Sequence, residues 1–107
     1  MKTRYFKEVE GKGMSPSLLQ KLDYARTIAG IPFVITSHIR KDNPESSHYR
    51  GLAVDSQAVH SRVRYVILKS LVTAGFTRIG VYPKHIHADV DNSKDLRVIW
   101  YGRYKKK

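Results

Sequence analysis

The stretch "HIHADVD" at residues 85–91 constrains the fold more than any other part of the sequence. Successive side chains of a β-strand point to opposite faces of the sheet. One face of an extended chain here carries the apolar residues Ile86, Ala88 and Val90. The other face carries His85, His87, Asp89 and Asp91. The pattern therefore predicts a strand with one side in a hydrophobic core and the other side lined by potential ligands.

Two helices and several further strands are expected around this stretch. Ser15 and Pro16 suit the N-cap and first position of a helix that Gly30 ends. A second amphipathic helix is expected over residues 63–74, with Gly75 at its C-terminal end. Strands are expected over 33–37, 51–55, 76–82, 85–91 and 96–101, the last three as a meander. This order predicts an α+β domain with a mainly antiparallel sheet and helices packed on one side.

The length and the absence of cysteine restrict the possible architectures. A chain of 107 residues is expected to form one domain, with a loose lead-in over 1–13 and a basic tail over 103–107. Without cysteine, disulfides and thiolate zinc sites are excluded, so any metal must have nitrogen and oxygen ligands. No membrane span and no signal peptide are visible. We therefore expect a monomer that is synthesised in the cytoplasm.

The net charge of +11 implies an anionic partner. Nucleic acid, an anionic cell envelope and an acidic substrate all satisfy this requirement. The tyrosines and arginines around residues 97–104 would suit base stacking and phosphate contacts, which makes a basic nucleic-acid-binding protein one candidate. The basic tail over 103–107 is equally consistent with contact to such a partner and with a solvated chain end.

The stretch "SSHYRGLAVD" at residues 46–55 supplies a second group of polar residues. By itself, the polar row at 85–91 is equally consistent with a solvated sheet face. Combined with His48 and Asp55, however, His87 completes a set of two histidines and one carboxylate. Such a set suits a zinc ion whose fourth position is open to water. Zinc in this setting lowers the pKa of its bound water to about 7.

These residues resemble the signature of a family of zinc peptidases. The matching pattern is Ser46-x-His48-x-x-Gly51-x-Ala53-x-Asp55, followed at a distance by His87-x-Asp89. The family comprises D-alanyl-D-alanine carboxypeptidases, VanX-type dipeptidases and L-alanyl-D-glutamate endopeptidases, together called LAS enzymes. The likeness covers most of the chain, and its further matches are Thr36-Ser37-x-x-Arg40, "AGFTRIGVY" and Trp100. The chain looks most like the small members carried by phages.

The resemblance implies a fold, a cofactor and a substrate. The fold would be Hedgehog/DD-peptidase-like, and one zinc ion would be bound by His48, Asp55 and His87. Arg40 would hold a carboxylate of the substrate, and Ser46 would line the substrate pocket. The implied function is a murein peptidase, of endolysin or carboxypeptidase type, that cuts peptidoglycan stem peptides. Its implied site of action is the cell wall of a bacterial host.

The chain departs from the family pattern at the expected general base. Family members carry an acid three residues before the last zinc histidine, where this chain has Lys84, and no glutamate follows Glu45. The remaining candidates are His85 as the proton carrier and Asp89, which more naturally orients a ligand imidazole. The segment from Arg40 to residue 46 is also shorter than in the family, so the cleaved bond is not assigned. A metal-binding relative with little catalysis is therefore an alternative.

Overall fold

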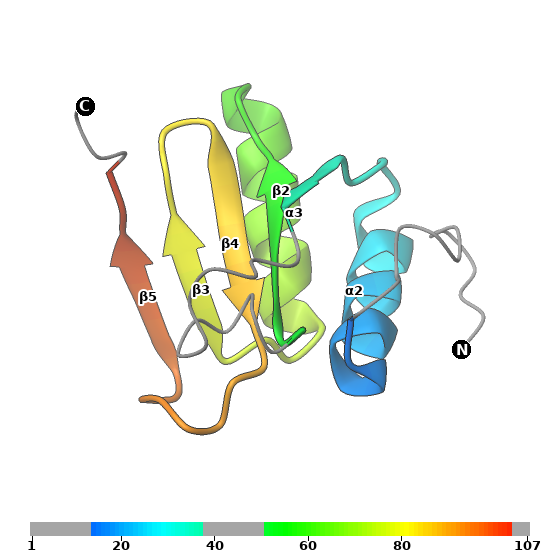
Figure 1. The fold of residues 1–107 in the computed structure, drawn as a ribbon. Coiled ribbons are helices and arrows are strands. Elements are labelled where there is room, and N and C mark those ends of the chain that lie inside the picture. The colour runs from blue at the N-terminus through cyan, green and yellow to red at the C-terminus, as the bar shows by residue number, and fades with distance from the viewer. Residues whose placement is uncertain (1–13, 38–50, 104–107) are drawn as a thin grey trace.

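The computed structural model describes residues 14–37 and 51–103 of the chain. The elements in these ranges are α2 (Pro16–Ala29), β1 (Ile35–Ser37), β2 (Ala53–Gln57), α3 (Ser61–Thr73), β3 (Arg78–Val81), β4 (His85–Asp89) and β5 (Val98–Tyr101). They form a small α+β domain with a five-stranded mixed sheet (Figure 1). Three residues of the predicted site, Arg40, Ser46 and His48, lie outside the described ranges.

α2 begins and ends where its capping residues Ser15 and Gly30 predict. α3 ends just before Gly75 as predicted, but it begins at Ser61, two residues earlier than expected, after an N-cap residue, His60, whose side chain makes no capping hydrogen bond. The Ser15 Oγ accepts a hydrogen bond from the Leu18 amide at 3.1 Å, which satisfies one of the free amides of the first turn. Gly30 follows α2 with φ of 69° and Gly75 follows α3 with φ of 95°, a region that favours glycine. Within the described ranges, neither helix is long and apolar enough to cross a membrane.

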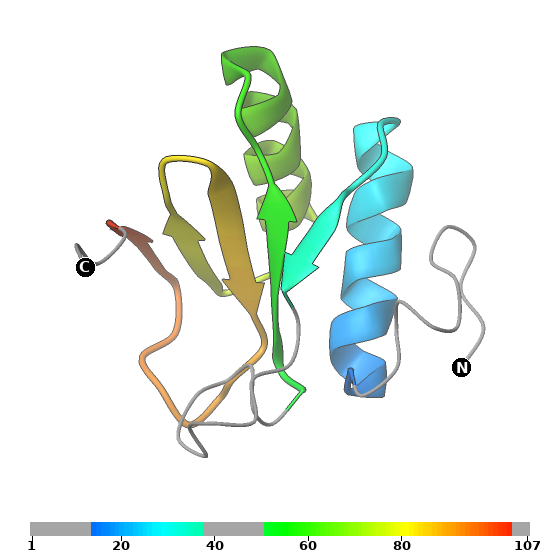
Figure 2. The same cartoon turned by 45° about the horizontal axis from the view of Figure 1, so that its top comes forward.

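The sheet has the order β1-β2-β4-β3-β5 (Figures 1 and 2). β1 and β2, β2 and β4, and β3 and β4 pair antiparallel, so the sheet is mainly antiparallel as predicted. The predicted meander of the last three strands is wrong, because β5 pairs in parallel with β3. The reason is that β2 and β3 occupy both edges of β4. The connection over residues 90–97 therefore takes β5 to the other edge of β3.

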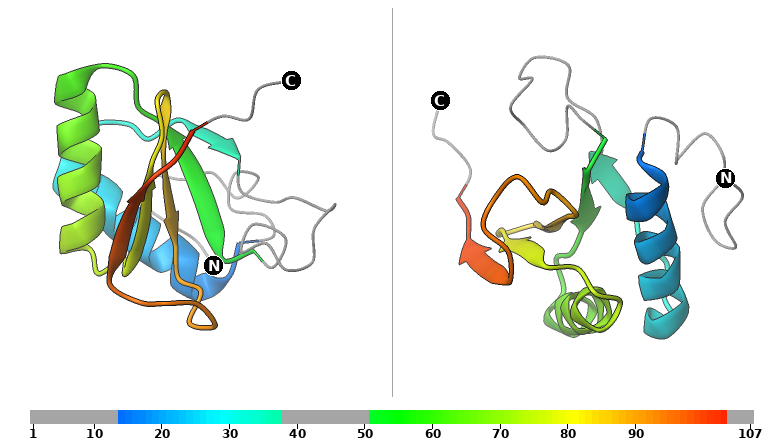
Figure 3. Two further views of the ribbon diagram at one scale, coloured as in Figure 1. Left: turned by 90° about the vertical axis from the view of Figure 1, so that its left-hand side faces the viewer. Right: turned by 90° about the horizontal axis from the view of Figure 1, so that it is seen from below.

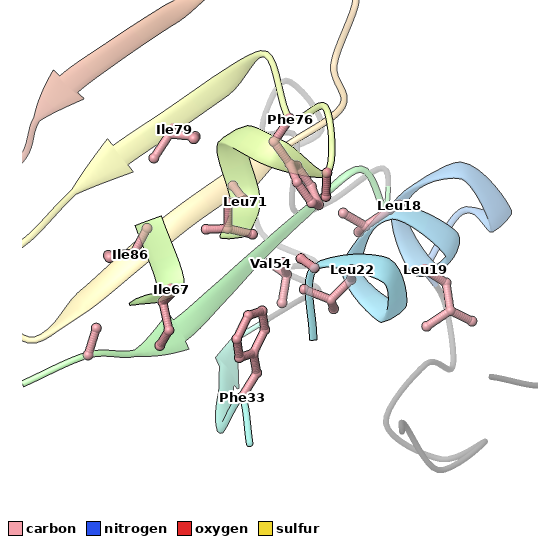
Figure 4. Close-up of a cluster of buried hydrophobic side chains, with 14 residues drawn as sticks. Leu18, Leu19, Leu22, Phe33, Val54, Ile67, Leu71, Phe76, Ile79 and Ile86 are labelled. Carbon is pink, nitrogen blue, oxygen red and sulfur yellow. The ribbon is translucent and has the colours of Figure 1, made fainter. Parts of the chain in front are cut away.

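The hydrophobic core lies between the two helices and one face of the sheet (Figures 3 and 4). Its fully buried members include Leu18 and Leu22 from α2 and Ile67 from α3. The strands contribute Val54, Ile79, Ile86 and Ala88. Ile86 and Ala88 belong to the apolar face predicted from the alternation, and Val54 and Ile79 join that face because both lie opposite Ala88. The opposite faces of β2, β3 and β4 are consequently available for polar side chains.

Candidate functional site

A row of functional side chains crosses the sheet on the face away from the core. Asp55 of β2 lies directly opposite His87 of β4 in the antiparallel register. His87 is opposite Gly80 of β3, and Gly80 is in register with Trp100 of β5. Directly opposite residues point to the same face of a sheet. The register therefore places Asp55, His87 and the Trp100 indole on one surface.

His87 lies between two buried carboxylates. Its Nδ1 is 3.1 Å from Asp55 Oδ1, and its Nε2 is 2.7 Å from Asp89 Oδ2. Asp55 and Asp89 are 4% and 1% exposed, respectively. Buried carboxylates require compensating charge or hydrogen bonds, and the imidazole offers a ring nitrogen to each. The three side chains form one hydrogen-bonded unit.

The two carboxylates raise the pKa of His87 above its usual value. Burial opposes this change, because desolvation disfavours the imidazolium and lowers the pKa. The hydrogen bonds to Asp55 and Asp89, together with their negative charges, outweigh burial. The two carboxylates therefore stabilise the protonated form of His87, whose ring lies between them.

His85 lies beside this unit, at the start of β4. Its Nε2 is 3.8 Å from Asp55 Oδ1, which is an ion-pair distance but longer than a hydrogen bond. Its ring is stacked on Tyr82, with centroids 4.4 Å apart and planes within 10°. The stacking fixes the plane of the imidazole next to the Asp55 carboxylate. An imidazole in this position can exchange a proton with a group bound near Asp55 and His87.

Arg78, Tyr82 and Trp100 extend the site across β3 and β5. Arg78 Nε lies 2.9 Å from Asp89 Oδ1, although among the described residues this buried nitrogen has no hydrogen-bond partner of normal geometry. The contact is therefore an ion pair rather than an aligned hydrogen bond. Trp100 Nε1 donates to the Tyr82 hydroxyl at 3.2 Å, and its ring centroid is 5.4 Å from that of His87.

Arg78 and Tyr82 were not among the site residues predicted from the sequence. A signal was present, because residues 78, 80 and 82 alternate with the apolar Ile79 and Val81 and so share the polar face. What the sequence lacked was the pairing of β3 with β4 and β5. That pairing brings Arg78 opposite Asp89.

Asp91 does not belong to the row, contrary to the prediction from alternation. β4 ends at Asp89, and the chain turns after it. The Asp91 carboxylate is buried and accepts a hydrogen bond from the Ser93 amide at 3.0 Å. Its other oxygen lies 3.7 Å from Lys94 Nζ. Asp91 thus stabilises the turn that follows β4.

Lys84 stands where the resemblance to zinc peptidases led us to expect an acid. It lies in the bend between β3 and β4, and its side chain is exposed. Its carbonyl oxygen accepts a hydrogen bond from the Ala58 amide at 2.9 Å. Lys84 therefore precedes β4 at the margin of the sheet, whereas His85 is the first residue of that strand.

Asp55 and His87 fit two adjacent positions around a zinc ion. Zinc–ligand bonds of about 2.0 Å in a tetrahedron place neighbouring donor atoms about 3.3 Å apart. The Asp55 Oδ1 and His87 Nδ1 atoms are 3.1 Å apart. In residues 14–37 and 51–103, no group of three His, Asp or Glu side chains is arranged to hold a metal. The third ligand implied by the resemblance, His48, lies outside these ranges.

The chain matches no family model, and neither the curated proteins nor the solved structures contain a match to it.

Proposed function

We propose that this chain is a zinc-dependent murein peptidase that hydrolyses peptide bonds in peptidoglycan stem peptides. The observation that carries the proposal is the opposition of Asp55 and His87 across β2 and β4, with donor atoms 3.1 Å apart. These residues would hold zinc together with His48. The resemblance to LAS enzymes supplies the substrate class, and a Hedgehog/DD-peptidase-like fold is part of the same proposal.

The ligand atom of His87 follows from its hydrogen bonds. Nε2 faces Asp89 at 2.7 Å, so Nδ1 is the nitrogen directed toward Asp55 and a shared cation. Zinc bound there would polarise the scissile carbonyl and lower the pKa of a bound water to about 7. Asp89 would orient the His87 imidazole, a role that carboxylates commonly have beside ligand histidines.

His85 is the proposed proton carrier. Its ring is held by Tyr82 and lies 3.8 Å from the Asp55 carboxylate, next to the reacting groups. An imidazole with an unperturbed pKa near 6.5 can accept and return a proton close to neutral pH. Arg40 would hold a carboxylate of the stem peptide through two hydrogen bonds, and Ser46 would line the pocket. The cell wall of a bacterial host would be the site of action, and the charge of +11 suits this anionic polymer.

Digestion of purified muropeptides, followed by mass spectrometry, tests the proposal. The zinc-loaded protein is expected to release stem-peptide fragments, and His87→Ala to release none. His85→Ala is expected to retain zinc but to cut about 10²–10⁴-fold more slowly, the usual contribution of a general acid–base group. His60→Ala is the matched control, because His60 is exposed and its side chain makes no capping hydrogen bond.

The outcome also separates the alternatives. Zinc binding without any product identifies a metal-binding relative with little catalysis. Binding to DNA whose affinity falls steeply with salt, in a protein that takes up no zinc, identifies a basic nucleic-acid-binding protein instead.

A further inference from the structure

Arg78 contacts three parts of the chain, two of which, β4 and β5, carry residues that contact His87. Its Nε is 2.9 Å from Asp89 Oδ1 on β4. Its Nη1 donates to the backbone carbonyl of Asp95, in the connection between β4 and β5. Its guanidinium carbon lies 5.1 Å from the centre of the Trp100 ring on β5. The side chain is 12% exposed, so these contacts are largely shielded from water.

The two oxygens of Asp89 have different partners. Oδ2 is bonded to His87 Nε2 at 2.7 Å, while Oδ1 faces Arg78 and accepts from the Asp91 amide at 3.1 Å. A carboxylate held at one oxygen by a cation and a backbone amide cannot rotate to offer His87 a different oxygen. The orientation of the Asp89 carboxylate therefore fixes the position of the oxygen to which His87 Nε2 is hydrogen-bonded.

We infer that Arg78 is a positioning residue that acts through Asp89 to direct His87 Nδ1 toward Asp55. Without the guanidinium, the buried Asp89 carboxylate loses its only nearby arginine among the described residues, and its orientation relaxes. His87 then has no fixed acceptor at Nε2, and its ring can turn. The consequence for zinc rests on the proposed function, whereas the orientation of the metal-free ring does not.

The sign of the effect on zinc binding separates positioning from simple electrostatics. Arg78 is positively charged and lies close to the site. If it acted only through its charge, its removal would strengthen the binding of a cation. Loss of positioning instead weakens zinc binding by about 10–100-fold, the usual cost of removing an outer-sphere partner. Arg78→Met is therefore expected to bind zinc more weakly despite the more negative site. Arg78→Lys, which keeps the charge but cannot make all three contacts, is expected to be intermediate.

The experiment combines zinc affinity with nitrogen and proton NMR of the His87 ring in the metal-free protein. At mildly acidic pH, the wild type should show a slowly exchanging Nε2 proton bonded to Asp89, and Arg78→Met should lose it. Arg62→Met is the control, since it removes the same charge from an exposed site on α3 and should change neither measurement.

Several results would overturn the inference. Zinc binding by Arg78→Met that equals or exceeds that of wild type is one, and an unchanged Nε2 proton is another. If Arg78→Met does not fold, Arg78→Lys is the variant that tests the inference. Zinc affinity and an Nε2 proton signal equal to those of the wild type in Arg78→Lys would contradict a positioning role. If the wild type binds no zinc, the proposed function fails, while the NMR comparison still tests the position of the ring.

Discussion

At the scale of single residues, His87 organises the polar face. Alternation along residues 85–91 predicted that His85, His87 and Asp89 share that face, and their contacts with one another and with Asp55 confirm it. Alternation assigns a face but not a register. It therefore could not predict that both nitrogens of His87 are bonded to carboxylates. It also included Asp91, because the sequence does not show that the strand ends at Asp89.

The raised pKa of His87 predicts a pH-dependent stability of the metal-free protein. The unfolded imidazole has a pKa of about 6.5, and the folded state binds the proton more tightly. The stabilisation by His87 is thus fully present below about pH 6.5 and is lost as the pH rises through the higher folded-state value. We expect the unfolding free energy to fall over this range, more steeply in wild type than in His87→Gln.

Urea unfolding between about pH 6 and pH 9 measures this difference, since the range begins near the pKa of an unfolded histidine, about 6.5, and extends above it. The gap between wild type and His87→Gln should narrow as the pH rises. A gap that stays constant would show that His87 does not take up a proton on folding.

At the scale of elements, the Trp100 indole of β5 lies directly over Gly80 of β3, which carries no side chain. A Cβ at Gly80 would lie 2.6 Å from the indole of Trp100, which is too close for any real contact. The indole covers the glycine and contacts His87 from that side. The parallel pairing of β5 with β3 is what brings Trp100 to this position.

Gly80→Ala is therefore expected to destabilise the fold by about 1–3 kcal/mol, the usual cost of overpacking. Trp100 is the only tryptophan, so its fluorescence reports both the unfolding and the displacement of the ring. In a Trp100→Ala background, followed by circular dichroism, the same substitution should cost much less. An equal loss of unfolding free energy in both backgrounds would show that the added methyl group does not clash with Trp100.

The elements themselves were largely predictable from the sequence, whereas their pairing was not. Ser15, Gly30 and Gly75 are local signals, and both helices follow them. The position of β5 depends on β4 being paired on both edges, which is a property of the whole sheet. A meander is the simplest arrangement of three successive strands. It is excluded here because β2 pairs with the edge of β4 that β5 would need.

At the scale of the whole molecule, one-sided packing gives the sheet two distinct faces. α2 and α3 pack on the core face, so the polar row on the opposite face depends on a sheet that these helices stabilise (Figure 4). Leu22 of α2 is fully buried in this core. The order of the elements along the sequence predicted helices packed on one side of the sheet.

Leu22→Ala is expected to lower the free energy of unfolding by about 2–5 kcal/mol, because it leaves a cavity in the core. Ile28→Ala, in the same helix at a position that is 38% exposed, is the control and should cost clearly less. Chemical denaturation of the two variants gives the comparison. Similar losses would mean that α2 is not packed as described.

Under the proposed function, Asp55 and His87 hold zinc together with His48. Metal analysis after zinc-replete expression and dialysis tests this proposal in wild type, Asp55→Asn, His87→Ala, His48→Ala and the His60→Ala control. We predict about one zinc ion per chain in wild type and in His60→Ala, and none in the other three variants. A wild-type protein without zinc, or zinc retained equally by all five proteins, would contradict the proposal.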